Sequence, residues 1–291
     1  MPVLCGGFLF DPAAESDGCP QGVQDRQNCG IDQAMNAIPT ANIKELVAII
    51  ARLREMPIGG RYSEMVLQRD RRVAESFLDR YPGRAHSVLG IIATIRGDEE
   101  EMRYHFEAAR EAEPHEAYIR TNHMVALQGF GCFSEAVLEA REACKDQPRH
   151  ADLLVEATFA CIYAGRFQEA AHWLENRDKL GVISPIPGAE EVHACARFLR
   201  EKRVSDLDVE SLQLQAAAIL RERRVLGAVA HYSLRQEETD HWITLRFVLR
   251  QPSREVAELD WLLSERLARS SLPERAFRHV VVGYLSREEP F

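Results

Sequence analysis

The segment "GCFSEAVLEAREACKDQP", from Gly131 to Pro148, decides the fold, because similar segments lie at equal distances on either side of it. "GDEEEMRYHFEAAREAEP" begins at Gly97 and "GRFQEAAHWLENRDKLGV" begins at Gly165, so the period is 34 residues. A fixed period of roughly 20–50 residues is the sequence signature of a repeat architecture. The chain therefore contains three copies of one supersecondary unit.

Each unit carries matching residues at fixed distances from its glycine. The residues five, twelve and seventeen positions after the glycine are Met102, Ala109 and Pro114, then Ala136, Ala143 and Pro148, then Ala170, Arg177 and Val182. A glycine relieves the tight turn between antiparallel helices, and small residues let two helices approach to about 8–10 Å. We therefore predict a helix, a glycine turn, a second helix and a proline-marked turn. The third unit has Arg177 and Val182 where the first two have alanine and proline. The repeat pattern alone therefore does not predict its second helix or the stacking of a further unit on it.

The period and the register of glycine, alanine and proline resemble those of the tetratricopeptide repeat family, over about residues 83–183. The resemblance implies a mainly α protein whose helical hairpins stack into an α-helical solenoid, since each hairpin leaves an apolar face that the next one covers. Residues 39–204 are predicted to form this repeat domain, with atypical N-terminal and capping helices. Its first helix runs from Ala41 to about Glu55 and is broken by "MPIGG"; the next runs from about Ser63 to Arg80 and stops at "YPG".

The pattern changes after residue 204, and residues 205–291 are predicted to form a small α+β domain. In "HWITLRFVLR" the apolar side chains alternate along a strand, with one face formed by Ile243, Leu245, Phe247 and Leu249. "AVAHYSLR" is predicted as its hairpin partner, "SREVAELDWLLSERLARS" as a helix and "FRHVVVGYL" as a closing strand. With a helix over Leu207–Arg223, the order helix–strand–strand–helix–strand is interpreted as a ferredoxin-like sandwich without its first strand.

The N-terminal segment lacks such a pattern. Residues 1–38 have scattered glycine, proline and cysteine, with neither helical nor alternating periodicity. We predict that they form a disordered leader. A start of translation at Met35 instead of Met1 is the open alternative.

The composition argues against several classes of function. The net charge is −9 at pH 7, so neither nucleic acid nor an anionic membrane is expected as a partner. No apolar run approaches the roughly 18 residues of a membrane span and no secretory signal is visible, so a cytoplasmic protein is predicted. The seven cysteines suit neither a disulfide scaffold nor the tight spacing of zinc ligands, so no metal or other cofactor is expected.

Signatures of catalysis are also missing from the sequence. It contains no phosphate-binding loop, no G-x-G-x-x-G, no G-x-S-x-G and no H-E-x-x-H motif, so no enzymatic activity is predicted and no catalytic residue is assigned. His123 occupies a packing position of the repeat and is interpreted as a core residue. For His231, His241 and His279, on or near predicted strands, solvated strand edges are favoured over a shared site.

The resemblance to tetratricopeptide repeats implies a groove, lined by the first helix of each hairpin, that binds a peptide or protein segment. Its register gives these partner-binding residues: Arg84, Ser87, Ile91, Ile95, Tyr118, Thr121, Val125, Gln128, Asp152, Val155, Phe159, Ile162 and Tyr163. Family members that grip acidic carboxyl-terminal tails place cations in the groove. Here those positions hold Ser87, Ile91, Asn122, Asp152 and Glu156, so a basic or apolar ligand is expected instead. The alternative is that flanking parts of the chain fill the groove.

The chain is therefore predicted to be a non-enzymatic interaction scaffold or adapter; a bacterial secretion chaperone and a toxin-neutralising immunity protein both fit this description. A second hypothesis places a small-molecule sensor or an enzyme in the C-terminal domain, with the repeats for recruitment. A third is a homodimer formed through the C-terminal sheet, because the apolar "HVVVGYL" strand could pair across a two-fold axis if it lies at an edge.

Overall fold

The computed structural model describes residues 40–56, 58, 62–182, 184–237 and 240–287, with residues 40–43 described by their backbone only. The predicted leader, residues 1–38, lies outside the described residues. Within the described part of the chain, every helix is too short or too polar to cross a lipid bilayer.

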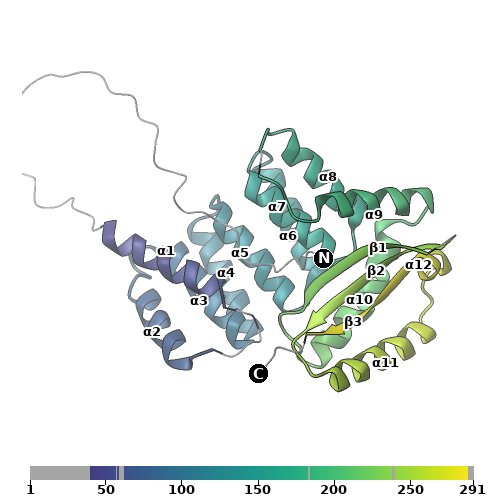
Figure 1. Ribbon diagram of the computed structural model, residues 1–291. Coiled ribbons are helices and arrows are strands. Elements are labelled where there is room, and N and C mark those ends of the chain that lie inside the picture. The colour runs from purple at the N-terminus through teal and green to yellow at the C-terminus, as the bar shows by residue number, and fades with distance from the viewer. Residues whose placement is uncertain (1–39, 57, 59–61, 183, 238–239, 288–291) are drawn as a thin grey trace, which may run out of the picture.

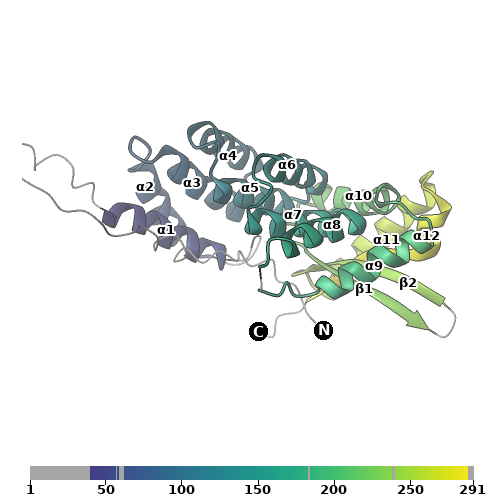
Figure 2. The ribbon, with the colours of Figure 1, turned by 90° about the horizontal axis from the view of Figure 1, so that it is seen from above.

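Four helical hairpins follow one another and form a solenoid (Figure 1, Figure 2). The three later hairpins turn at Gly97, Gly131 and Gly165, whose φ angles of 76°, 73° and 79° lie in the left-handed region that favours glycine. The predicted α-helical solenoid is confirmed, with the three glycines at equivalent turns. The hairpins are α1 (Thr40–Arg54) with α2 (Glu64–Glu75), α3 (Pro82–Arg96) with α4 (Glu99–Ala112), α5 (Ala117–Gly129) with α6 (Phe133–Asp146), and α7 (Ala151–Tyr163) with α8 (Phe167–Asp178).

Side chains at matching repeat positions fill the space between the hairpins. Phe133 and Phe167 lie one period apart and are both buried, with 1% and 0% of their surface exposed. The corresponding residue of the first unit, Glu99, instead accepts a hydrogen bond of 2.8 Å from Arg103. An ion pair therefore takes the place of an aromatic ring at the first turn.

Two details of the solenoid differ from the sequence prediction. Helix α2 ends at Glu75 rather than Arg80, and "YPG" begins α3 because Pro82 fits the first turn of a helix, where its missing N–H costs no hydrogen bond. In the third unit, Arg177 replaces an alanine, and its buried side chain donates to the Ser184 carbonyl at 2.6 Å. The chain then leaves the repeat pattern, and the next helix, α9 (Ala189–Glu201), packs on α8.

The C-terminal part is a three-stranded sheet in the order β1 (Val229–Glu237), β2 (Asp240–Leu249) and β3 (Val280–Ser286). The predicted hairpin is confirmed, because β1 pairs antiparallel with β2. The ferredoxin-like interpretation is wrong. Strand β3 pairs directly and in parallel with β2, through the crossover of α11 (Ser253–Arg269) and α12 (Glu274–His279), whereas a split unit requires another strand between them.

One face of this sheet packs against the solenoid. The predicted apolar face of β2 is confirmed, since Ile243, Leu245, Phe247 and Leu249 are all buried. The ring of Phe247 stacks on that of Phe133, with 5.0 Å between their centroids. The repeats and the C-terminal part therefore share one hydrophobic core.

Helix α10 (Asp206–Glu222) lies across the glycine turns of the hairpins. A Cβ added at Gly165 would lie 2.9 Å from a methyl carbon of Val209, and one added at Gly131 would lie 3.4 Å from Cγ of Arg221. Beyond the helix end, Leu226 covers Gly97, where an added Cβ would lie 2.6 Å from a methyl carbon of Leu226. The helix also accepts a hydrogen bond of 2.8 Å from the Tyr284 hydroxyl at the Ala216 carbonyl, so it joins the turns to the sheet.

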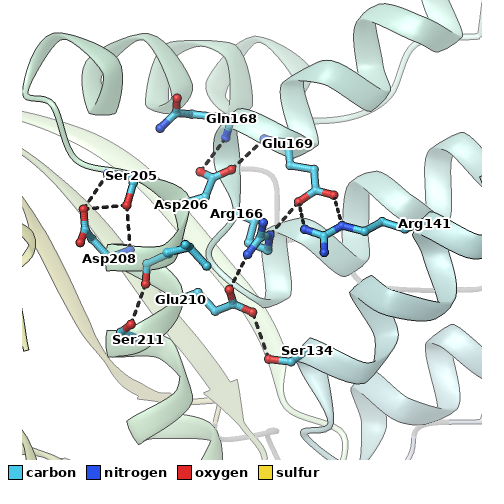
Figure 3. A network of polar contacts seen from close by, with 11 residues as sticks. Ser134, Arg141, Arg166, Gln168, Glu169, Ser205, Asp206, Asp208, Glu210 and Ser211 are labelled. Atoms are coloured by element: carbon cyan, nitrogen blue, oxygen red, sulfur yellow. Dashed lines mark hydrogen bonds and ion pairs between the residues drawn. The ribbon is translucent and has the colours of Figure 1, made fainter.

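The N-terminus of α10 is fixed by polar contacts to α8 (Figure 3). Ser205 and Asp208 form a capping box, in which each side chain accepts the backbone N–H of the other. Asp206 accepts the backbone N–H groups of Gln168 and Glu169 at 3.0 Å and 2.9 Å. These donors belong to the first turn of α8 and have no partner inside that helix, so Asp206 caps α8 from another helix.

A second carboxylate on α10 joins two hairpins. Glu210 accepts a hydrogen bond of 3.0 Å from the Ser134 hydroxyl and is ion-paired with Arg166 (Figure 3). Arg166 also pairs with Glu169 at 2.7 Å, and Glu169 pairs with Arg141 at 2.6 Å. Because Ser134 and Arg166 belong to successive units, this network fixes the spacing between them.

Gly165→Ala is expected to lower the free energy of unfolding by roughly 2–4 kcal/mol, because it combines left-handed backbone strain with the contact to Val209. Gly181→Ala is the matched control, since Gly181 has a similar φ of 74° and nothing within 4 Å of its added Cβ. The control should lose only roughly 1–2 kcal/mol. Urea unfolding measures both variants, and equal losses would contradict the packing of α10 on this turn.

Asp206→Ala is expected to cost roughly 1–3 kcal/mol, because it removes both acceptors from the first turn of α8. Hydrogen exchange should become faster at the amides of Gln168 and Glu169 in particular. Leu207→Ala is the control on the neighbouring side chain, which is 64% exposed and should change neither quantity. Unchanged exchange at the two amides in Asp206→Ala would show that the cap is not formed.

Candidate functional site

All thirteen predicted groove residues lie on the first helices of the hairpins, α3, α5 and α7, and we call this surface the groove face. The buried members are Ser87, Ile91, Ile95, Thr121, Gln128, Ile162 and Tyr163. The half-buried members are Arg84, Tyr118, Val125, Asp152, Val155 and Phe159.

Accessibility increases from α3 towards α7. Ile91, Val125 and Phe159 occupy the same repeat position on the three helices; Ile91 is 3% exposed, whereas Val125 and Phe159 are half-buried. The repeat position one helical turn earlier shows the same trend, because Thr121 on α5 is buried and Val155 on α7 is half-buried. The accessible apolar part of the groove face is therefore on α5 and α7.

The chain itself covers the α3 end of the groove face. The end of α1 and the segment after it contribute Leu53, Met56 and Ile58, which leave a cavity of only about 10 Å³ against α3 and α5. Ile58 also lies against Gly129, where an added Cβ would be 2.6 Å from its terminal carbon. The cavity is lined by Leu53, Met56, Ile58, Ile91, Thr94, Ile95, Asn122 and Ala126.

A polar contact crosses the groove face from α1 to α5. Arg54, the last residue of α1, donates to the side-chain oxygen of Asn122 at 2.6 Å. Asn122 is fully buried and in turn donates to the Ser87 hydroxyl at 3.2 Å. Buried polar groups are costly unless they are hydrogen-bonded, so Arg54 and Ser87 together stabilise Asn122 in this position.

Two carboxylates of α7 interact electrostatically with this arginine. Glu156 occupies the repeat position of Asn122 in the next unit, and Asp152 lies one helical turn before it. The pKa of Glu156 is raised to about 7, chiefly by burial, while the attraction of Arg54 lowers it and the repulsion of Asp152 raises it. Burial lowers the pKa of Arg54, and both carboxylates counteract that shift. Asp152 and Glu156 on the groove face therefore already interact electrostatically with Arg54 of the same chain.

The residues at the beginning of the inner helices interact with one another. The guanidinium of Arg84 lies over the Tyr118 ring, 5.6 Å from its centroid, and the Tyr118 hydroxyl donates to Glu113 at 2.8 Å. These contacts join successive units at one end of the groove face. Asp152 occupies the same repeat position on α7.

Sequence reasoning missed the role of Arg54 in this site. The arginine is 68 residues from Asn122 and lies outside the three clear repeats, so no spacing connects the two. It also missed a pair of imidazoles, in which the Nδ1 atoms of half-buried His86 and buried His105 lie 2.9 Å apart. Burial and the neighbouring His86 lower the pKa of His105 to about 4, so at neutral pH this pair is uncharged.

The histidines considered in the sequence analysis pack against other side chains or lie on the sheet. His123 stacks on Phe106, with 5.2 Å between the ring centroids, and its Nδ1 lies 3.7 Å from Glu139. His231 pairs with Arg246 across the sheet, and His241 pairs with Gln236 nearer the other end of the hairpin. His279 ends α12 and contacts the Phe198 ring. The three C-terminal histidines therefore do not converge, and the described residues include no cluster suited to a metal ion.

The described cysteines are buried, and burial raises the pKa of their thiols, that of Cys132 to about 11. A thiol with so high a pKa is a poor nucleophile at neutral pH. These residues are Cys132, Cys144, Cys161 and Cys195.

Strand β3 lies at an edge of the sheet, as the homodimer hypothesis requires. One of its backbone groups is already bonded, because the Tyr284 N–H donates to the carboxylate of Asp260 on α11 at 2.9 Å. A carboxylate placed against a strand edge is a common means of limiting further pairing. At this edge, a second chain could therefore extend the sheet only over the remaining part of β3.

A scan of protein-family models and searches of curated proteins and of solved structures return no match to this chain. The resemblance to tetratricopeptide repeats rests on the repeat spacing and on the positions of the turns.

Glu156→Gln is expected to remove a pH dependence of stability. A folded-state pKa of about 7, against 4.5 ordinarily, means that the folded chain binds more protons between these values, so the wild type loses stability as pH rises. Relative to the wild type, the variant should gain roughly 1–3 kcal/mol between pH 5 and pH 8 in urea unfolding. Glu175→Gln, on the exposed surface of α8, is the control and should not gain. A parallel response of Glu156→Gln and wild type would contradict the burial of this carboxyl.

Proposed function

We propose that this chain is a non-enzymatic protein-interaction scaffold that binds a peptide or protein segment on the α5–α7 part of the groove face. The observation that carries the proposal is the half-buried apolar row of Val125, Val155 and Phe159, which α1 does not cover as it covers Ile91. An accessible apolar row on a solenoid of hairpins is typical of a binding surface.

The surroundings of this row define the chemistry of its ligand. Asp152 and Glu156 lie on the same helix as Val155 and Phe159, and the chain carries a net charge of −9. An acidic surface favours a basic partner and repels an acidic tail. The bound segment is therefore apolar with at least one basic residue. Secretion chaperones and immunity proteins are the members of this class that a cytoplasmic scaffold of this kind would match.

The proposal is tested by capture of partners from a lysate of the native host, with the full-length chain as bait. Val155→Lys places a cation on the apolar row, and it should reduce capture of a stoichiometric partner by about tenfold or more, equivalent to roughly 1.4 kcal/mol. Val155 is half-buried, so the lysine can reach solvent without unfolding the helix.

Leu138→Lys is the matched control, because Leu138 is 57% exposed on α6, the second helix of its hairpin. It should capture the partner as well as the wild type does. Equal capture by Val155→Lys, or the lack of any stoichiometric partner, would contradict the proposed function.

A further inference from the structure

The turn between α9 and α10 carries two arginines that have no carboxylate partner among the described residues. Arg200 lies in the last turn of α9 and Arg203 in the turn after it, and both side chains are exposed. Arg200 donates from Nε to the Ala196 carbonyl of its own helix, at 3.3 Å. In the neighbouring network, by contrast, Arg141 pairs with Glu169 at 2.6 Å. The charges of the two arginines therefore remain for an anion from outside the chain.

Both arginines line one cavity, which has a volume of about 330 Å³ and is open to solvent. Hydrogen bonds fix its wall between the starts of α8 and α10. The Gln168 side chain donates to the Val204 carbonyl at 3.0 Å, and the Ser205 hydroxyl donates to Asp208 at 2.8 Å (Figure 3). The wall is thus formed before a ligand arrives, which lowers the conformational cost of binding. The cavity is lined by Gln168, Arg200, Arg203, Val204, Ser205 and Asp206.

The acidic residue of this lining, Asp206, already has donors for both of its oxygen atoms. It accepts the backbone N–H groups of Gln168 and Glu169, at the positive end of the α8 dipole. Asp208, beside the lining, is ion-paired with Arg275 at 3.0 Å. The charge that stays uncompensated at the cavity is therefore positive.

The backbone of Arg203 has a conformation that favours glycine. Its φ of 55° lies in the left-handed region, and its N–H donates to the Arg200 carbonyl at 3.1 Å. The next N–H, of Val204, donates to the Leu199 carbonyl at 2.9 Å, so this residue ends α9 as a glycine ordinarily would. The chain thus places a guanidinium at the cavity where glycine would be less strained.

We propose that this cavity binds a phosphate monoester, whose oxygen atoms are held by Arg200 and Arg203. Guanidinium groups bind phosphate through paired, charge-assisted hydrogen bonds, and a phosphate monoester carries nearly two negative charges at neutral pH. The volume is near the lower limit for small-molecule sites, so it accommodates the phosphate with a small group attached. A small phosphate ester and a phosphorylated side chain present the same chemistry. The lining belongs to α8, α10 and the turn after α9, so the site is separate from the groove face.

The test uses the full-length protein and O-phosphoserine, either free or at the centre of a capped five-residue peptide that otherwise contains only alanine, at pH 7.5. The melting temperature should rise saturably, by about 2–5 °C when the probe is at roughly ten times its Kd. Serine and the unphosphorylated peptide, at equal ionic strength, should produce no saturable rise. Tighter binding of the peptide would identify a phosphorylated side chain as the ligand, and equal or tighter binding of the free amino acid would identify a small phosphate ester.

Arg203→Gly separates binding from folding. It should weaken binding of the phosphorylated probe by about tenfold or more, yet melt at no lower a temperature than the wild type, because glycine suits a φ of 55°. Arg224→Gly is the matched control, since Arg224 follows α10 with a φ of 53° and is not part of the lining. This variant loses the same charge and should bind as the wild type does. Arg200→Gln should weaken binding as Arg203→Gly does.

Four results would overturn the proposal. They are the lack of a saturable rise with both phosphorylated probes, an equal response of Arg203→Gly and wild type, an equal loss in Arg224→Gly and Arg203→Gly, and an equal rise with malonate. Malonate carries two negative charges at pH 7.5 without a phosphate group, so an equal rise would show attraction by charge alone.

Discussion

The docking of α10 across the glycine turns is the constraint on which the rest of the structure depends. Stacked hairpins ordinarily contact only their neighbours, and their turns face solvent. In this chain the turns at Gly131 and Gly165 contact α10, and the turn at Gly97 contacts the residue Leu226 beyond it. The polar contacts of Asp206 and Glu210 fix the position of the helix at one end, and the Tyr284 hydroxyl links it to the sheet. The solenoid and the C-terminal part are thereby held as one body.

The same arrangement determines which part of the hairpins remains accessible. Since α10 and the sheet occupy the turn side of the hairpins, the inner helices provide the accessible apolar row. Its α3 end is covered by Leu53, Met56 and Ile58, and its middle is crossed by Arg54. What remains is a short surface on α5 and α7 that combines two valines and a phenylalanine with two carboxylates.

The local features of the fold could be predicted from the sequence, and the long-range ones could not. The period placed the turns at Gly97, Gly131 and Gly165, and the alternation in "HWITLRFVLR" identified the buried face of β2, because both are patterns within a short segment. The parallel pairing of β3 with β2 depends on a crossover of two helices, which leaves no local pattern, and the ferredoxin-like interpretation failed there. For the site, the repeat register identified the inner helices, but burial at Ile91 and Ile95 depends on covering residues outside the clear repeats. Asp206 caps a helix to which it is not adjacent in sequence, so no capping motif marked it.

The contact between α10 and the turns also limits where a further hairpin could be inserted. The helix has 17 residues, and at about 1.5 Å per residue it is roughly 26 Å long. Its residues Val209 and Arg221, which contact the third and second glycine turns, lie roughly 18 Å apart along it, and Leu226 beyond its end reaches the first turn. An additional hairpin inserted into this solenoid would place one turn beyond the reach of α10 and move Asp206 away from the start of α8. A unit duplicated between the second and third glycine turns would therefore require a longer α10, whereas in an open array a duplicated unit needs no change elsewhere in the chain.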